Sequence, residues 1–147
     1  MAHPERFKAA VAVHVFLLRE GQILLLRRAN TGYEDGNFSV VAGHLDGGET
    51  IVAAAIREAR EEAGIALRPS DLSVVGVMHN QSSAQEYIDF FLRAERWEGE
   101  VVNAEPRKCA ELAWHALDAL PPNVIPYVRR AIENFRAGVW FDSCGWR

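Results

Sequence analysis

Glu58 and Glu62 have the side-chain type and the spacing to bind a divalent metal ion. If Thr50–Ala63 is a helix, residues four apart lie one above the other, and two like charges placed in this way destabilise it. Mg²⁺ would remove that repulsion, because proteins typically bind it through one or two carboxylates together with substrate phosphates. The alternative is a solvated charged face on which Arg57 and Arg60 neutralise the glutamates.

The segment Thr50–Ala63 has the features of an amphipathic helix. It contains no Gly or Pro, Thr50 can cap its N-terminus, and Gly64 follows its last residue. One apolar stripe must face a core, and it is formed by Val52, Ala55, Ile56, Ala59 and Ala63. Glu58 and Glu62 lie beside this stripe, so we expect both at the border between core and solvent.

The residues around this helix resemble a known signature. Read from Gly43, the sequence is GHLDGGETIVAAAIREAREEAGI, which is similar to the box of the Nudix hydrolases at every specified position. That box is Gly, five residues, Glu, seven residues, then Arg-Glu-aliphatic-x-Glu-Glu-x-Gly-aliphatic. The matching residues are Gly43, Glu49, Arg57, Glu58, Ala59, Glu61, Glu62, Gly64 and Ile65. These nine matches over 23 residues are far more specific than a lone pair of glutamates.

The resemblance implies a fold and an activity. The family fold is a mixed β-sheet between α-helices, of the α/β (α+β) class. Its members use Mg²⁺ or Mn²⁺ to hydrolyse a nucleoside diphosphate linked to another group, by attack of water at phosphorus. A nucleoside triphosphate or a related nucleotide is therefore the expected substrate. The alternatives are hydrolysis of ADP-ribose or a dinucleoside polyphosphate, or a non-catalytic nucleotide-binding or regulatory domain with the same fold.

The resemblance also implies roles for the box residues. Glu58 and Glu62 would be the main metal ligands, and Glu61 would contribute directly or through water. The backbone carbonyl of Ala42 would be a further ligand. Four residues would support the box. Arg57 and Glu49 would form an ion pair that aims the carboxylates, and Gly43 and Gly64 would supply the required backbone conformation.

The general base in this family often lies in a loop after the box. The candidates are Glu105 and Glu111, with Glu86 behind them. Glu111 is preferred because it leads directly into the strand that carries Trp114. For each of the three, the alternative is an ordinary surface glutamate.

Three residues near the Gly-rich loops could contact the substrate, namely Arg28, Tyr33 and His44. The alternatives are a solvated arginine at a strand end, a packing tyrosine and an exposed loop histidine. Asn80 stands where many ADP-ribose hydrolases carry a proline, and Tyr87 comes later than the tyrosine of dinucleoside polyphosphate hydrolases. Both departures favour a small nucleoside triphosphate or a related diphosphate.

The elements that must position these side chains alternate between strand and helix patterns. Strands are expected over Ala10–Leu18, Gln22–Arg27, Phe38–Val41, Leu72–His79, Tyr87–Ala94 and Leu112–His115, and a second helix over Ile125–Ala137. Glu20 and Gly21 suit a hairpin turn, and 43–48 reads as a loop. Trp140 and Trp146 are expected to cover the core. This order indicates a layered α/β or α+β domain.

The composition is that of an ordinary globular domain, with 147 residues, 49% of them hydrophobic and 24% charged. We therefore expect one domain over residues 1–147. A net charge of −4 disfavours a broad basic surface for nucleic acid, and the apolar run Ala9–Leu18 is too short to cross a membrane. We expect a cytoplasmic monomer or homodimer whose partner is a small-molecule nucleotide. Cys109 and Cys144 are expected to be free thiols, with one disulfide as the alternative.

Overall fold

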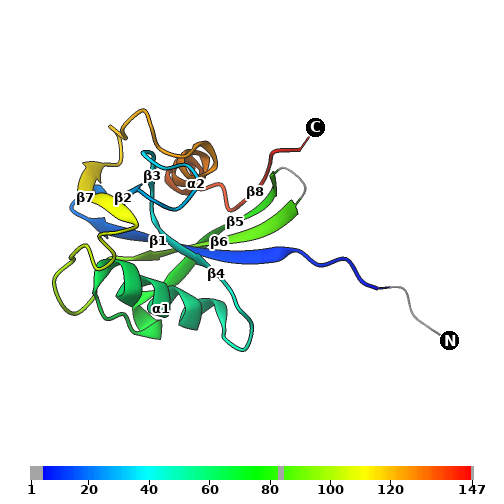
Figure 1. The fold of residues 1–147 in the computed structure, drawn as a ribbon, viewed down its shortest axis with the longest axis horizontal. Coiled ribbons are helices and arrows are strands. Elements are labelled where there is room, and N and C mark those ends of the chain that lie inside the picture. Colours follow the sequence, from blue (N-terminus) through cyan, green and yellow to red (C-terminus); the bar gives the residue numbers. More distant parts are fainter. Residues whose placement is uncertain (1–4, 83–84, 147) are drawn as a thin grey trace.

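The computed structural model describes residues 5–82 and 85–146, which form one mixed sheet with a helix on each face (Figure 1). The strands are β1 (Ala10–Arg19), β2 (Gln22–Arg28), β3 (Phe38–Ser39), β4 (Val41–His44), β5 (Ser73–Ser82), β6 (Gln85–Ala94), β7 (Cys109–Ala116) and β8 (Phe141–Cys144). The helices are α1 (Ile51–Ala63) and α2 (Pro126–Ala137), with a short 3₁₀ turn, η1 (Pro69–Asp71), after α1. The expected mixed sheet between helices is confirmed.

Strand β1 is the centre of the sheet. The strand order is β3-β2-β1-β6-β5-β8, while β4 pairs with β1 and β7 pairs with β2. β1 is parallel to β6 and antiparallel to β2 and β4. The turn between β1 and β2 is the expected one, because Glu20 and Gly21 both have positive φ angles, 52° and 76°.

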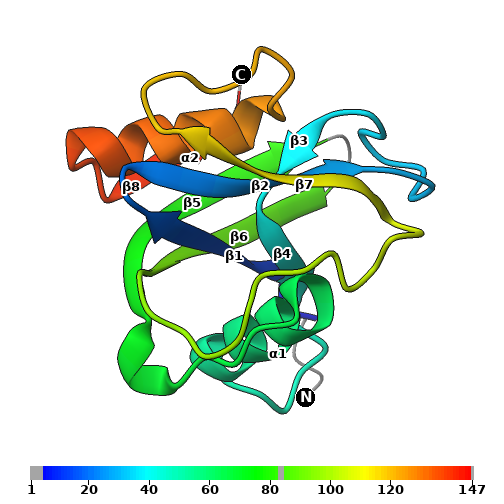
Figure 2. The same cartoon turned by 90° about the vertical axis from the view of Figure 1, so that its left-hand side faces the viewer.

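The side chains of β1 alternate between two cores, one under each helix (Figure 2). Val13, Val15 and Leu17 pack with the buried alanines of α1. Phe16 and Leu18 pack on the opposite face with residues of α2. This two-sided burial explains why β1 is apolar at nearly every position rather than at every second one.

The segment expected as one strand over Phe38–Val41 is two strands. Phe38–Ser39 pairs with β2, whereas Val41–His44 pairs with β1, so the chain crosses between neighbouring strands at Val40. The expected loop at 43–48 accordingly begins later, because Gly43 and His44 belong to β4. Local residue patterns could not predict this division, because it depends on which distant strand each half meets.

The C-terminal segment also differs from expectation. Residues Phe141–Cys144 form β8, an additional strand parallel to β5. Trp140 is 56% exposed and Trp146 is also exposed, so the expectation that both cover the core is wrong. Within the described ranges Cys109 and Cys144 are both free cysteines, as expected. No helix that the structure describes is long and apolar enough to cross a membrane.

Candidate functional site

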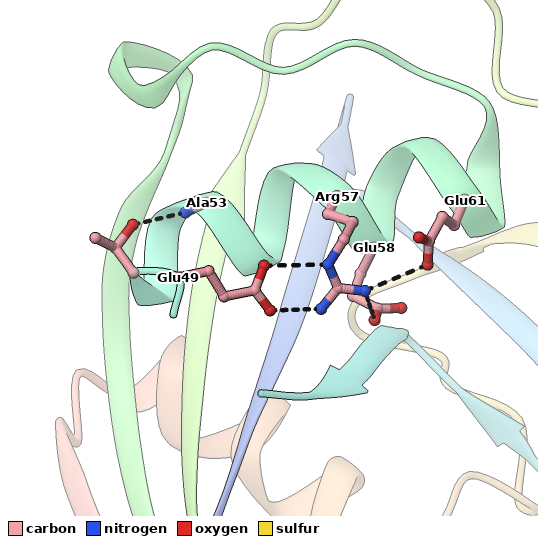
Figure 3. Close-up of polar contacts among 6 residues, drawn as sticks. Glu49, Ala53, Arg57, Glu58 and Glu61 are labelled. Atoms are coloured by element: carbon pink, nitrogen blue, oxygen red, sulfur yellow. Dashed lines mark hydrogen bonds and ion pairs between the residues drawn. The ribbon is translucent and has the colours of Figure 1, made fainter. Parts of the chain in front are cut away.

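Helix α1 is held close to the sheet by small side chains and is capped at both ends. Ala54, Ala55 and the alanines one and two turns later are fully buried, which lets the helix backbone approach β1 and β4 closely. At its N-terminus the Thr50 hydroxyl accepts a hydrogen bond from the Ala53 amide at 3.0 Å (Figure 3). At its C-terminus Gly64 adopts a left-handed conformation with φ 71°. Glu58 and Glu62, which directly precede the buried Ala59 and Ala63, are therefore fixed in direction.

Glu58 and Glu62 project from α1 toward strand β4. The Ala42 amide donates a hydrogen bond to Glu62 Oε2 at 3.2 Å. A Cβ atom added to Gly43 would lie 2.2 Å from the carboxyl carbon of Glu58, so only glycine leaves room for this carboxylate. The two carboxylates are thus packed against the edge of β4 that β1 does not occupy.

Burial strongly perturbs the Glu62 carboxyl. Desolvation raises the pKa of Glu62 well above its ordinary value, and a hydrogen bond and the negative charge of Glu58 act in the same direction. The hydrogen bond from Ala42 opposes this shift. Two neighbouring carboxylates that are largely removed from water repel each other unless a proton or a cation lies between them. This is the electrostatic condition that favours binding of a hard cation.

Arg57 holds the carboxylates in place (Figure 3). Its Nη2 and Nε donate to the two oxygens of Glu49 at 2.7 and 3.1 Å, which is the bidentate geometry of a strong pair. Its Nη1 donates to Glu58 Oε1 at 2.7 Å and to Glu61 Oε2 at 3.4 Å. The Arg57–Glu49 pair implied by the sequence is present, and it also fixes Glu58.

Glu61 is not brought to the Glu58–Glu62 pair. It lies on the exposed side of α1, with its side chain 47% exposed and directed toward Arg57. In the described part of the chain no three His, Cys, Asp or Glu side chains converge on one point. The site therefore offers two carboxylates and the backbone of β4. Because the N–H and C=O of a strand residue lie on the same edge, the Ala42 carbonyl points to the same side as its amide, toward the glutamates.

The three candidate bases lie in different places. The loop that carries Glu105 is attached to α1, because the Ala104 amide donates a hydrogen bond to the Glu62 carbonyl at 3.3 Å. The charge of Glu105 accordingly contributes to the raised pKa of Glu62. Glu111 instead faces Arg27, with 3.8 Å between the charged atoms. The Glu86 carboxylate accepts a hydrogen bond from His79 Nε2 of the neighbouring strand β5 at 2.8 Å. The structure favours Glu105 over Glu111, and the identity of the base stays a prediction.

The candidate substrate residues form two separate contacts. Arg28 Nε donates to the Tyr33 carbonyl at 2.7 Å, and its guanidinium lies 5.3 Å from the Tyr33 ring centre. The ring of His44 lies 5.8 Å from that of Tyr87. His44 pairs with Ala12 of β1 and so lies on the sheet face that α2 covers, whereas the Glu58–Glu62 pair faces α1.

The sequence reasoning missed Asp89 and its neighbours. Asp89 is only 3% exposed, in the middle of the apolar strand β6. Burial raises its pKa to about 6, and a hydrogen bond with Asn80 acts in the opposite direction. A charged residue between Ile88 and Phe90 was the signal that could have identified it.

Comparison with known proteins gives a consistent result. The family model described as NUDIX domain matches residues 8–135. An NAD-capped RNA hydrolase NudC from Pseudomonas aeruginosa is 31% identical over 108 residues, which cover 74% of this chain and 37% of that protein. An 8-oxo-dGTP diphosphatase from Escherichia coli is 27% identical over 125 residues, covering 84% of this chain and 95% of that protein. The chain therefore spans little more than a third of the NudC relative.

Solved structures agree with the sequence relatives. A crystal structure of a MutT NUDIX hydrolase from Burkholderia pseudomallei superposes with a TM-score of 0.79 and 29% identity. The match covers 86% of this chain and 98% of that one. The shared architecture thus extends over almost the whole of that smaller protein.

Proposed function

Because the chain belongs to the Nudix hydrolase family, we propose that it hydrolyses a nucleoside triphosphate or a related nucleotide with Mg²⁺ or Mn²⁺ bound by Glu58 and Glu62. The observation that carries the proposal is the position of these two carboxylates, both packed against β4, with the pKa of Glu62 raised by burial and by Glu58. A divalent cation stabilises such a pair in the way that a shared proton does, and it leaves both groups ionised.

The donor set suits a hard cation. Two carboxylates and the Ala42 carbonyl supply three oxygen ligands, and Mg²⁺ usually completes its shell with water and substrate phosphates. When bound, the metal ion neutralises charge on the phosphate oxygens and lowers the pKa of a bound water. Soft ligands are not part of this set, since the thiol of Cys109 is buried and donates to the Glu111 carbonyl.

The remaining residues would orient the carboxylates, the attacking water and the substrate phosphates. Arg57 keeps Glu58 directed at the site and prevents it from turning into solvent. Glu105, whose charge contributes to the raised pKa of Glu62, would accept the proton of the attacking water. Arg28 would bind a phosphate oxygen of the substrate through its guanidinium. These roles account for catalysis by positioning and charge stabilisation, which is what phosphoryl transfer requires.

The net charge of −4 disfavours a long polyanionic partner and so favours a small nucleotide over a capped RNA. ADP-ribose and dinucleoside polyphosphates remain the alternative substrates, and nucleotide binding without turnover is the alternative function.

The test is a nucleotide panel assayed with Mg²⁺, with pyrophosphate and orthophosphate release measured separately. The panel contains nucleoside triphosphates, ADP-ribose, a dinucleoside tetraphosphate and NAD. We expect turnover of a triphosphate that is abolished by EDTA and by Glu62→Gln, while the matched surface variant Glu133→Gln keeps full activity. Tight binding of a nucleotide by calorimetry without turnover of any panel member would refute the enzymatic proposal.

A further inference from the structure

Strand β8 forms one edge of the sheet, beside β5 (Figure 1). Within the described part of the chain no strand pairs with its outer side. Three consecutive apolar residues at this edge are exposed: Val139 by 43%, Trp140 by 56% and Phe141 by 56%. Such a run is unfavourable in water, so its presence on a folded surface indicates a place where another surface binds.

The backbone of β8 can pair with a further strand at one residue in particular. The Trp140 carbonyl accepts a hydrogen bond from a β5 amide, and backbone groups alternate between the two edges of a strand, so the groups of residues 141 and 143 point outward. The Ser143 amide already donates to Asp142 Oδ1 at 2.8 Å, and the Val139 amide donates to a carbonyl of α2. Phe141 is therefore the outward residue that can offer both its amide and its carbonyl.

The edge has no device that would keep another strand away. Natural edge strands are usually protected by lysine, proline or a bulge, and residues 139–144 contain neither lysine nor proline. The charged side chain in this segment is Asp142, which accepts hydrogen bonds from Arg130 of α2 at 2.5 and 3.0 Å. Its charge is thus compensated within the chain and does not repel a second strand.

A second copy of the same strand fits this edge. Antiparallel pairing with Phe141 opposite Phe141 forms two N–H···O bonds that are related by a two-fold axis. The same pairing places Trp140 of each copy opposite Asp142 of the other. Both side chains lie on the face that α2 covers, because they are two residues apart and Asp142 contacts α2. The exposed guanidinium of Arg130 can then stack on the indole of the other copy, so each favourable contact forms twice.

The exposed area sets the strength of such a contact. A large aromatic side chain has about 150–250 Å² of surface, so Trp140 and Phe141 together expose about 200 Å² per copy. Stable interfaces bury about 600–1,000 Å² per partner, and smaller ones belong to weak, transient complexes. The two aromatic residues supply about a third of the lower limit, and the backbone of β8 and Val139 add to it. The area therefore fits a weak dimer with a dissociation constant in the micromolar range.

We propose that two copies of this chain associate through β8, by antiparallel pairing centred on Phe141, into a weak two-fold dimer with one continuous sheet. The interface is separated from β1 by β5 and β6, whereas the Glu58–Glu62 pair packs against β4 on the other side of β1. Association therefore leaves both carboxylate sites open, and the inference does not depend on the proposed function.

The test is sedimentation velocity of the wild-type protein and its variants between about 1 and about 200 µM. Wild type should change from monomer to dimer over this range. Phe141→Glu and Phe141→Lys should each stay monomeric, because residue 141 faces its own copy and like charges would meet there. An equimolar mixture of the two variants should dimerise again, since opposite charges then face each other. The control Phe7→Glu changes an exposed phenylalanine elsewhere and should dimerise as wild type does.

A further variant tests the contact beside the two-fold axis. Trp140→Ala should weaken dimerisation about tenfold, because it removes the surface on which Arg130 of the other copy stacks. Circular dichroism of every variant should match that of wild type, since the changed side chains are exposed.

Four results would overturn the proposal. Wild type could stay monomeric at about 200 µM, or a dimer could persist in both Phe141 variants, which would place the interface elsewhere. A mixture of the two charge variants that stays monomeric would exclude pairing centred on residue 141. Monomeric wild type that sediments with phosphatidylcholine vesicles would assign the exposed apolar run to a lipid surface instead of a second copy.

Discussion

Replacing Asp89 with asparagine is expected to stabilise the folded protein at neutral pH. The substitution keeps the shape of the side chain and removes a charge that the fold buries. Because the pKa of Asp89 is raised from 3.8 to about 6, the folded state binds a proton more tightly than the unfolded state does. The penalty of the ionised carboxyl is therefore absent at low pH, grows as the pH rises from about 4 to about 6, and stays constant above.

The shift gives the size of the effect. A difference of about 2.2 pKa units, from 3.8 to about 6, corresponds to about 3 kcal/mol at about pH 7.5. At about pH 4.5 the same two pKa values leave a penalty of only about 1 kcal/mol. Asp89→Asn should remove the penalty at both pH values, and the hydrogen bond to Asn80 can be kept by an amide. The stability gain should thus be about 2 kcal/mol larger at the higher pH.

Urea unfolding followed by circular dichroism measures this difference. Wild type, Asp89→Asn and Asp118→Asn are unfolded at both pH values, without metal or nucleotide. Titration of His14 and Glu62 changes the stability of all three proteins alike, so the difference between variant and wild type isolates Asp89. Asp118 is exposed in the turn after β7, so Asp118→Asn should differ from wild type by no more than about 0.5 kcal/mol at either pH.

Two results would contradict this reasoning. A gain that is the same at both pH values would mean that Asp89 titrates normally and that its oxygens are hydrated. A loss of stability at about pH 7.5 would mean that the ionised carboxylate makes a favourable interaction in the folded protein. In either case Asp89 Oδ2 would not be a buried acceptor without a partner.

Three further predictions concern the carboxylate site. Glu62→Gln should raise the melting temperature in EDTA, because it removes a buried charge. It should also abolish the increase in melting temperature that Mg²⁺ gives the wild type. An Mg²⁺-dependent increase in the melting temperature of the variant would exclude Glu62 as a ligand. Gly43→Ala should keep the circular dichroism spectrum but lower kcat about 100-fold, since the new Cβ would displace the Glu58 carboxyl from a position 2.2 Å away. Arg57→Lys should weaken the Mg²⁺ affinity measured by calorimetry by about tenfold, because lysine keeps the charge but cannot bind Glu49 through two nitrogens. An unchanged Mg²⁺ affinity would mean that Arg57 does not orient Glu58.

The parts of the molecule that local sequence determines could be predicted. Helix α1 begins and ends at Thr50 and Gly64 because the capping interactions lie within a few residues of each end. The register of Glu58 and Glu62 on that helix follows from its period alone. The resemblance to the box, and not the helix itself, implied that the backbone of Ala42 lies near the glutamates, and the Ala42–Glu62 hydrogen bond joins residues that are 20 apart in sequence.

The parts that depend on distant pairing could not be predicted. Strand β8 forms because Phe141–Cys144 lies beside β5, and nothing in its own residues requires a strand. Glu105 and Glu111 are six residues apart in one loop and strand, yet only the path of the loop over α1 decides which one is near Glu62. Asp89 was not identified from the sequence because its neighbours do not show that α2 covers that face of β6.

Strand β4 lies beside two groups of polar residues. Its outer edge contacts Glu62 through Ala42, and its His44 side chain lies on the face that also holds Asp89. Each group contains a carboxyl whose pKa is raised by burial. A cation would relieve the penalty at Glu62 and leave the penalty at Asp89 unchanged, because the two carboxyls lie on opposite faces of the sheet. Mg²⁺ should therefore raise the stability of wild type and of Asp89→Asn by the same amount, and a smaller increase in the variant would mean that the two carboxyls are coupled.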